Sequence, residues 1–363
     1  NDTLQLLSNI NIFSEEQNYT IPENITNTLD LNGYFIYVSF ESFISNLGNL
    51  TITDTSETKN GKIESTDYNS IVNSGNLTIK GTTIAGKSTD NYKSIIKNMG
   101  SGILNLINSK IICTEVVRSN NEYKTSFIYN MDNASININN SEIETEDRNT
   151  SHNYILSNSR GKIKATDSSV GTIVLSHYGN YSTEKISWDK DGEYYAELEI
   201  DDGSVSNIIT EGYYNVLVNN NAVVKVINSK LTNINITDSK IDVINYDYIY
   251  QLNNLNYSML IQNSTVNKLN MYNYTSASVI DTKISSLSIY SNADVQINNS
   301  SINDLIDNVY VSGYLNIENG YFDQVKNYKS ITVKKGNFSG SIYNEGTITA
   351  EEFYYNSDEN IDN

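Results

Sequence analysis

GNLTIKGTTI, at residues 75–84, is the stretch of sequence that decides the fold, because variants of it recur along the chain. Clear variants stand at 102–111 (GILNLINSKI), 134–143 (ASININNSEI), 161–170 (GKIKATDSSV) and 293–302 (ADVQINNSSI). Each begins with a small residue, has apolar residues at its third, fifth and tenth places, and has a turn-forming residue at its seventh. Alternation of apolar and polar residues predicts a β-strand with one buried face.

The seventh place of this stretch predicts a tight bend. It is occupied by glycine, asparagine or aspartate, which tolerate a left-handed backbone. The residues at this place are Gly81, Asn108, Asn140, Asp167, Asp202, Asn228, Asn263, Asp281, Asn299 and Asn319. Each stretch is therefore expected to form a strand, a bend and a second strand.

The spacing of the repeats predicts how the strands are arranged. The stretch begins near positions 48, 75, 102, 134, 161, 196, 222, 257, 275, 293, 313, 329 and 346, in steps of 16 to 20 residues from 257 onward and of 26 to 35 before it. A unit this short cannot enclose a core of its own and must stack on its neighbours. The sequence therefore predicts an all-β fold, a parallel β-solenoid, with loops inserted into the longer coils of its N-terminal two-thirds.

We expect one long domain with three parts. Residues 1–33 lack a clean copy of the stretch and are assigned to an N-terminal cap, because the open end of a solenoid core needs a cover. Residues 34–353 form the solenoid, with long coils to about residue 256 and compact coils at 257–353. Residues 354–363 form a C-terminal tail.

A second recurrent phrase leads into the first, as in SIVNSG at residues 70–75 and FIYN at 127–130. With both phrases, residues 34–353 resemble the right-handed parallel β-helix superfamily, the pectate-lyase-like proteins, and within it bacterial surface and secreted proteins. The pairs Phe43…Asn46 and Phe127…Asn130 also resemble half of the repeat signature of polymorphic membrane adhesins. The resemblance implies a single-stranded, right-handed parallel β-helix.

Charge and composition restrict the partners. The formal net charge is −19, with only three arginines, which opposes binding to phosphate backbones and anionic lipid. Because of this charge we expect no nucleic-acid partner. No run of 18 apolar residues occurs, so we also expect no membrane insertion. The only cysteine, Cys113, stands at an alternate spacing from Ile111 and is expected in the core. The abundance of Asn, Ser, Thr, Ile and Tyr indicates an extracellular or bacterial cell-surface location.

The insertion at residues 171–195 is the richest in aromatic residues and is a candidate ligand contact. Trp188, Tyr181, Tyr194 and Tyr195 are expected to project beside the coils. Aromatic faces pack against sugar C–H surfaces and anchor protein interfaces. The alternative is that these rings pack onto the outer wall of the coils, since large aromatic residues usually bury most of their area.

The same insertion holds a candidate metal site. Asp189, Asp191 and Glu193 offer oxygen ligands at alternate places, with Gly192 for a sharp turn. This is the opening of a calcium-binding loop, so calcium is the one cofactor that the sequence suggests. Ile200 stands at the twelfth place, where such a loop needs a carboxylate, and an acidic solvated hairpin is the alternative.

The compact coils predict a row of tyrosines. Counting three places back from each repeat start gives Tyr272, Tyr290 and Tyr310, and later Tyr343, with Lys326 between. Their neighbours one place earlier are apolar, so the tyrosines are expected to face outward. Such a row would stabilise adjacent coils by ring contacts, or would offer an aromatic track to a linear glycan or an extended peptide.

Catalysis is the alternative function, because this fold also carries enzymes. A polysaccharide lyase or glycoside hydrolase needs paired carboxylates, or calcium with a basic residue. Asp201-Asp202 and Arg160-Gly161-Lys162 match parts of a polygalacturonase-like pattern, but in reversed order. Places in the repeat explain Asp202 and Lys162, so we name no catalytic residue.

The sequence therefore predicts a non-catalytic adhesin or binding module, expected as a monomeric part of a larger surface protein. Its partner would be a host or environmental glycan or protein. An enzyme on the same fold and a structural stalk are the alternatives. Three carboxylates converging in one groove would favour the enzyme, exposed aromatic residues without them the binding module, and neither feature the stalk.

Overall fold

The computed structural model describes residues 2–14, 17–40, 42–66, 70–88, 94–116, 126–145, 153–158, 162–177, 195–201, 204–212, 221–227, 230–236, 258–271, 276–290, 293–302, 309–322 and 324–355. Within these ranges the chain is all-β, and its strands pair in parallel. The described residues contain no helix long and apolar enough to cross a membrane. The chain divides into two compact units, residues 1–174 and 175–363.

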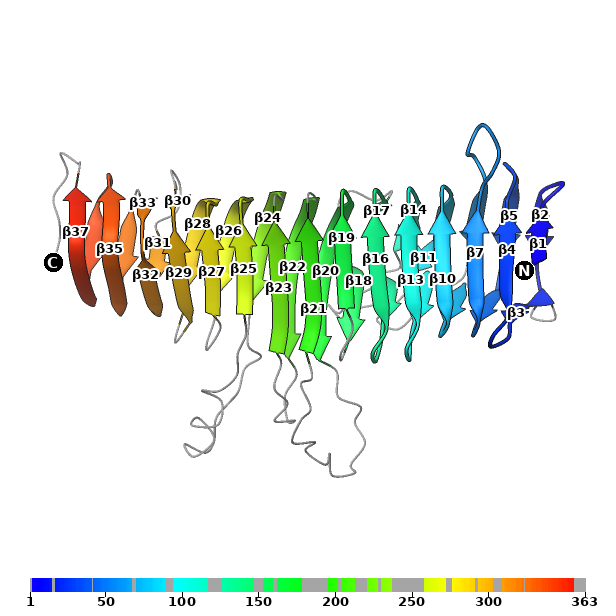
Figure 1. Ribbon diagram of the computed structural model, residues 1–363, viewed down its shortest axis with the longest axis horizontal. Coiled ribbons are helices and arrows are strands. Elements are labelled where there is room, and N and C mark those ends of the chain that lie inside the picture. Colours follow the sequence, from blue (N-terminus) through cyan, green and yellow to red (C-terminus); the bar gives the residue numbers. More distant parts are fainter. Residues whose placement is uncertain are drawn as a thin grey trace, which may run out of the picture. The chain divides into compact units, whose positions relative to one another are not determined.

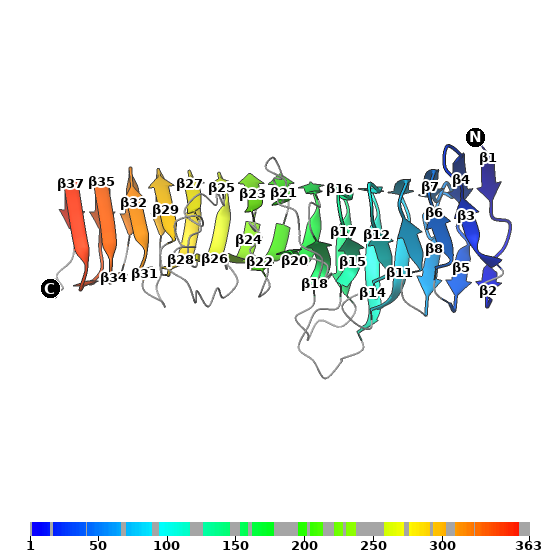
Figure 2. The ribbon, with the colours of Figure 1, turned by 90° about the horizontal axis from the view of Figure 1, so that it is seen from below.

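The first unit consists of three stacks of parallel strands (Figures 1 and 2). The first stack contains β1 (Asp2–Gln5), β4 (Thr26–Asp30), β7 (Asn49–Thr53), β10 (Asn76–Lys80), β13 (Ile103–Ile107), β16 (Ser135–Asn139) and β19 (Lys162–Thr166). The second contains β2 (Ile10–Ile12), β5 (Phe35–Val38), β8 (Lys62–Ser65), β11 (Thr83–Ser88), β14 (Lys110–Val116), β17 (Glu142–Thr145) and the start of β20 (Ser169–His177). The third contains β3 (Tyr19–Ile21), β6 (Ile44–Asn46), β9 (Ile71–Asn73), β12 (Ile96–Asn98), β15 (Ser126–Asn130) and β18 (Asn153–Asn158).

The second unit repeats this plan; Figure 1 shows β25, β27, β29 and β32 side by side. Its first stack contains β21 (Tyr195–Asp201), β23 (Asn221–Ile227), β25 (Ser258–Gln262), β27 (Ser276–Ile280), β29 (Asp294–Asn298), β32 (Tyr314–Ile317) and the first halves of β35 (Ser330–Phe338) and β37 (Thr347–Tyr355). The second contains β22 (Ser204–Gly212), β24 (Lys230–Ile236), β26 (Thr265–Met271), β28 (Lys283–Ile289), β30 (Ser300–Ile302), β33 (Gly320–Phe322) and the second halves of β35 and β37. The third contains β31 (Val309–Val311), β34 (Val325–Asn327) and β36 (Ile342–Asn344), and it follows the end of β28.

Long stacks of parallel strands are the arrangement expected of a β-solenoid, so the predicted all-β, parallel fold class is confirmed. Residues 2–30, which the sequence assigns to a cap, carry β1 to β4. In register, β1 pairs with β4, β2 with β5, β3 with β6, and β4 with β7. The described N-terminal strands thus belong to the same stacks as the repeats that follow.

The core consists of columns of apolar side chains that the repeat predicts. In the first stack, Leu77 is paired with Leu104, and Leu104 with Ile136. The predicted inward residues are all 2% exposed or less, which confirms that prediction: Leu77, Ile79, Leu104, Leu106, Ile136, Ile138, Val295, Ile297, Leu315 and Ile317. Cys113 is buried as expected.

The bends also follow the sequence. A positive φ, the left-handed conformation, is found at Gly81, Asn108, Asn140, Asp167, Asn263, Asp281 and Asn299. Asn319 differs, because its φ is not positive. Asp202 and Asn228 lie outside the described residues.

The small residue that opens each repeat is explained by close approach between coils. A Cβ added at Gly75 would fall on the carbonyl oxygen of Gly48 in the preceding coil. At Gly313 it would lie 2.5 Å from the carbonyl oxygen of Ala293 and 2.7 Å from the Ile289 side chain. At Gly75 and Gly313 the backbones of successive coils therefore leave almost no room for a side chain.

A ladder of buried asparagines stabilises the third stack of the first unit. Asn46, Asn73, Asn98 and Asn130 are each 1% exposed or less, and each side-chain amide donates to the side-chain oxygen of the next at 2.7 Å. The ladder starts at Asn46, whose Oδ1 has no partner among the described atoms, because Ile21 occupies the preceding coil. Asn327 and Asn344 form the same contact, also at 2.7 Å, in the second unit.

Candidate functional site

Most of the aromatic and acidic residues predicted for the long insertion fall outside the described residues. This applies to Trp188, Tyr181 and Tyr194, to the calcium candidates Asp189, Asp191 and Glu193, and to Tyr272. Tyr195 begins β21, where its backbone is paired with Asn221 of β23. The candidate sites that the structure describes therefore lie on the compact coils, at Tyr290, Tyr310 and their surroundings.

Four tyrosines form a continuous row along the compact coils, which we call the tyrosine ladder: Tyr290, Tyr310, Tyr328 and Tyr343. Their ring centroids are separated by 5.1 Å, 5.1 Å and 5.8 Å in that order, and the rings are tilted by 35° to 54°. These are distances at which aromatic rings attract each other. Tyr328 and Tyr343 are 38% and 39% exposed, and Tyr290 and Tyr310 are partly buried.

The register of the third stack makes this ladder a zigzag. Ile289 is paired with Val311, so Tyr290 lies one residue past the pair and Tyr310 one residue before it. Val311 is paired with Asn327, which places Tyr328 at the level of Tyr290. Tyr343 is paired with Lys326, which is paired with Tyr310. Tyr290 and Tyr328 thus stand in one column, and Tyr310 and Tyr343 in a neighbouring one.

Sequence counting missed Tyr328 because it used one fixed offset from each repeat start. That offset selects Lys326, whose backbone does hold the predicted position between Tyr310 and Tyr343. Tyr310 is paired with Ser288 and not with Tyr290, so the register differs from the expected one by two residues. A shift of two residues keeps the Tyr290 side chain on the same face of the strand but places it in another column. The signal for Tyr328 is its place directly after Asn327, the buried asparagine that ends β34.

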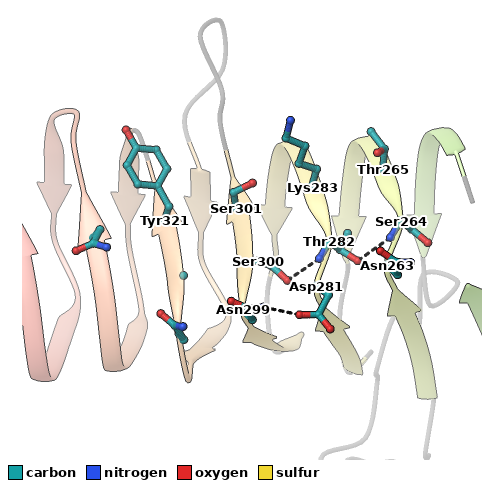
Figure 3. Close-up of a pocket in the computed structure, with 13 residues that line it drawn as sticks. Asn263, Ser264, Thr265, Asp281, Thr282, Lys283, Asn299, Ser300, Ser301 and Tyr321 are labelled. Carbon is teal, nitrogen blue, oxygen red and sulfur yellow. Dashed lines mark hydrogen bonds between the residues drawn. The ribbon is translucent and has the colours of Figure 1, made fainter. Parts of the chain in front are cut away.

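A second feature, which we call the bend groove, follows the bend between the first and second stacks of the second unit (Figure 3). It is a cavity of about 570 Å³. Its lining residues are Asn263, Ser264, Thr265, Asp281, Thr282, Lys283, Asn299, Ser300, Ser301, Asn319, Gly320, Tyr321 and Asn337.

The floor of the bend groove consists of buried hydroxyl residues that join successive coils. The Ser264 backbone N–H donates to the Thr282 hydroxyl at 3.3 Å, and the Thr282 backbone N–H donates to the Ser300 hydroxyl at 3.1 Å. Each hydroxyl in turn donates to the carbonyl two residues earlier, at 2.7 to 2.8 Å. Gly320 continues the floor, since a Cβ there would lie 2.7 Å from the buried ring of Phe322.

Two rows of polar side chains form the rims (Figure 3). One rim carries Asn263, Asp281, Asn299 and Asn319 at the bends, and the Asn299 amide donates to Asp281 at 2.6 Å. The other rim is an in-register column of Thr265, Lys283, Ser301, Tyr321 and Asn337. The left-handed bend residues are exposed, because the chain turns around them and the floor residue that follows points inward.

A related groove of about 500 Å³ follows the same bend in the first unit, past Gly81, Asn108 and Asn140. There the rim is closed by ion pairs. Lys110 lies 3.0 Å from Glu142 and 2.7 Å from Glu144. Hydrogen bonds to Glu144 and Glu142 raise the pKa of the Lys110 ammonium. In this groove the charges of Lys110, Glu142 and Glu144 are thus paired with each other.

The described residues contain no group of three or more His, Cys, Asp or Glu side chains placed to hold a metal ion. Among the described residues, Asp281 is the one carboxylate that lines the bend groove. Of the partial enzyme pattern, Lys162 begins β19 with an exposed side chain, Asp201 ends β21, and Arg160 and Asp202 lie outside the described residues. The described residues of the bend groove and of the tyrosine ladder offer hydrogen-bonding groups and aromatic rings.

Comparisons with protein-family models, with curated proteins and with solved structures found no match for this chain.

Proposed function

We propose that this chain is an extracellular binding module, an adhesin of the bacterial cell surface, built as a right-handed parallel β-helix. In this proposal the tyrosine ladder binds a linear glycan. The observation that carries it is the unbroken row of Tyr290, Tyr310, Tyr328 and Tyr343 on the outside of the compact coils. The composition and the resemblance of the repeats support the extracellular location.

The geometry of the ladder suits a polymer of rings. Neighbouring tyrosines are 5.1 to 5.8 Å apart, which is comparable with the length of one monosaccharide in a linear β-linked glycan. Aromatic faces pack against the C–H surfaces of sugars, and tyrosine adds a hydroxyl that can hydrogen-bond with sugar hydroxyls. Because the rings also contact each other, the platform is rigid before binding, which lowers the entropy cost of association.

The ladder also has a structural role that does not conflict with binding. Each ring pair contributes about 0.5–1.5 kcal/mol to the contact between coils. The tests must therefore separate lost binding from lost stability.

A glycan array supplies the test. Wild-type protein and the double variant Tyr310→Ser/Tyr328→Ser would be compared, with Tyr354→Ser as the matched control. Tyr354 is 54% exposed on β37 and is not part of the ladder. We expect the double variant to lose at least one class of glycan that the wild type and the control both bind, in samples with similar far-UV circular dichroism.

A glycan-array profile of the double variant that is identical to the wild-type profile would contradict the proposal. A parallel array of extracellular-matrix proteins covers the other class of ligand. Binding confined to that array would replace the glycan with a protein partner.

A further inference from the structure

We infer that the bend groove of the second unit is a separate binding site for a linear, uncharged polysaccharide. This inference concerns other residues than the tyrosine ladder. The groove lies at the bend between the first and second stacks, whereas the ladder follows the third.

The dimensions of the groove suit a single extended polymer chain. Its volume of about 570 Å³ is within the range of about 300–1,000 Å³ that is typical of ligand sites. The in-register rim from Thr265 to Asn337 spans four coil steps of about 4.8 Å each, or about 19 Å. A groove that crosses coil after coil favours a repeating ligand over a compact one.

The rim groups are available for hydrogen bonds. Within the described part of the chain, the side chains of Thr265, Lys283 and Ser301 make no hydrogen bond or ion pair. The amides of Asn319 and Asn337 are exposed on the same groove. The rims thus present hydroxyl and amide groups, which can donate to and accept from sugar hydroxyls, and one ammonium group, which can only donate.

Tyr321 supplies the one aromatic ring among the described lining residues of the groove. It is 41% exposed, and its hydroxyl lies 2.6 Å from the Ser339 hydroxyl, which fixes the orientation of the ring. An oriented ring beside a row of hydrogen-bonding groups offers both parts of sugar recognition, C–H stacking and hydroxyl pairing.

The charges of the groove and of the chain favour a neutral ligand. The described lining residues carry one ammonium, Lys283, and one carboxylate, Asp281. The whole chain carries a formal charge of −19, which repels a polyanion. A peptide would need apolar pockets for alternate side chains, and the lining offers mainly amide and hydroxyl groups.

The floor makes the groove a preformed site. The hydroxyls of Ser264, Thr282 and Ser300 already bond to backbone groups of their own and neighbouring coils. They hold successive rim residues at the strand spacing, so a ligand would not have to order the rims on binding. In the first unit the corresponding groove has Lys110 engaged with Glu142 and Glu144, so the inference is confined to the second unit.

The experiment is affinity electrophoresis in gels that contain a soluble polysaccharide. The probes are neutral polymers (hydroxyethylcellulose, xylan, galactomannan, soluble starch) and anionic ones (polygalacturonate, alginate). All groove variants are made in the ladder-free background Tyr310→Ser/Tyr328→Ser, so that the proposed ladder site does not contribute. We expect that background to be retarded by at least one neutral polymer, to be unaffected by the anionic ones, and to keep its retardation at high salt.

Two variants then probe the groove. Tyr321→Ala removes the ring, and Ser301→Ile replaces an open hydroxyl with a larger side chain that a strand tolerates. Each is expected to weaken retention about tenfold or more. Thr83→Ile is the matched control, because Thr83 occupies the ninth place of its repeat as Ser301 does, but in the first unit.

Retention that is unchanged in both groove variants would overturn the inference, as would a ladder-free protein that no neutral polymer retards. Equal loss in Thr83→Ile would also count against it, since that residue lies in the other unit. Thermal melting of each variant identifies any that is unfolded, and Tyr321→Ala alone suffices if Ser301→Ile does not fold. Failure here leaves the ladder proposal standing, because the ladder is tested by different variants.

Discussion

The side-chain amide nitrogen of Asn73 lies 2.7 Å from the side-chain oxygen of Asn98 in the next coil, and both side chains are buried. Asn98 in turn donates to Asn130 at 2.7 Å, and its amide also lies 3.3 Å from the Gly102 carbonyl oxygen and 3.0 Å from that of Ser135. One side chain therefore satisfies polar groups in three successive coils. Its removal takes a hydrogen bond from each of these groups at once.

Asn98→Ala should accordingly be strongly destabilising. The Asn98 side chain makes four hydrogen bonds, each worth about 0.5–1.5 kcal/mol, so we expect the free energy of unfolding to fall by several kcal/mol. Asn137→Ala is the control, because Asn137 is exposed and bonds only to Asn105, at 2.9 Å. Urea denaturation followed by circular dichroism measures both. If both variants had a similar small effect, that result would contradict a structural role for the asparagine ladder.

Gly75→Ala should prevent normal stacking of the coils around it. The added Cβ would fall on the carbonyl oxygen of Gly48, a backbone atom that cannot rotate away. Gly81→Ala is a useful comparison, because nothing lies within 4 Å of a Cβ at Gly81 and its cost comes from a φ of 62°. We expect the melting temperature to fall much further for Gly75→Ala. Equal shifts would mean that close approach does not dominate.

Ile138→Asp should destabilise the first unit by several kcal/mol, because it places an unpaired charge at a side chain that is 1% exposed. Asn139→Asp, one residue further along β16, puts the same carboxylate on the exposed face. Soluble expression and thermal melting of the pair provide the measurement. Normal melting of Ile138→Asp would refute the inward column.

The stability of the N-terminal coils should depend on pH through Asp30 and Asp54. Burial raises the pKa of the Asp54 carboxyl, but hydrogen bonds from Ser56, Gly61 and Gly33 outweigh it and hold the pKa below its ordinary value of 3.8. For Asp30, burial is likewise outweighed by hydrogen bonds from Thr55, Gln5 and Asn32.

A lowered carboxyl pKa in the folded state means stabilisation that is fully present above pH 3.8 and lost as the pH falls through the folded value. We therefore expect acid destabilisation of the first unit below about pH 4. Asp54→Asn should lower stability at pH 7 and flatten this dependence. Melting curves between pH 3 and pH 7 measure it, and an unaltered slope in Asp54→Asn would assign the effect to other groups.

Much of the fold was predictable because the same pattern of apolar and bend-forming residues recurs in each coil. Alternation at Leu77 and Ile79 sets the inward face, and Asn108 or Asn140 sets the bend. The tyrosine ladder was predictable in part, because Tyr290 and Tyr310 are members of it. The two-residue shift in the pairing of β28 with β31 was not predictable, because it depends on how the coil closes and no local pattern encodes that. The bend groove was not predicted at all. It arises only when the seventh and ninth places of several coils align across a floor of Ser264, Thr282 and Ser300.

The asparagine ladder implies that its stack of strands can grow or shrink only in whole coils. Every amide donates in the same direction, from one coil to the next along the sequence. Deleting residues 75–101 would remove Asn98 together with β10, β11 and β12 and would bring Asn73 up to Asn130, with Leu50 facing Leu104. The steps of the ladder are 27, 25 and 32 residues long, so loops can vary in length, but the loss of one residue within a strand would turn an inward side chain outward. Gain or loss of a complete repeat would thus change the number of coils while every remaining coil keeps a matching neighbour.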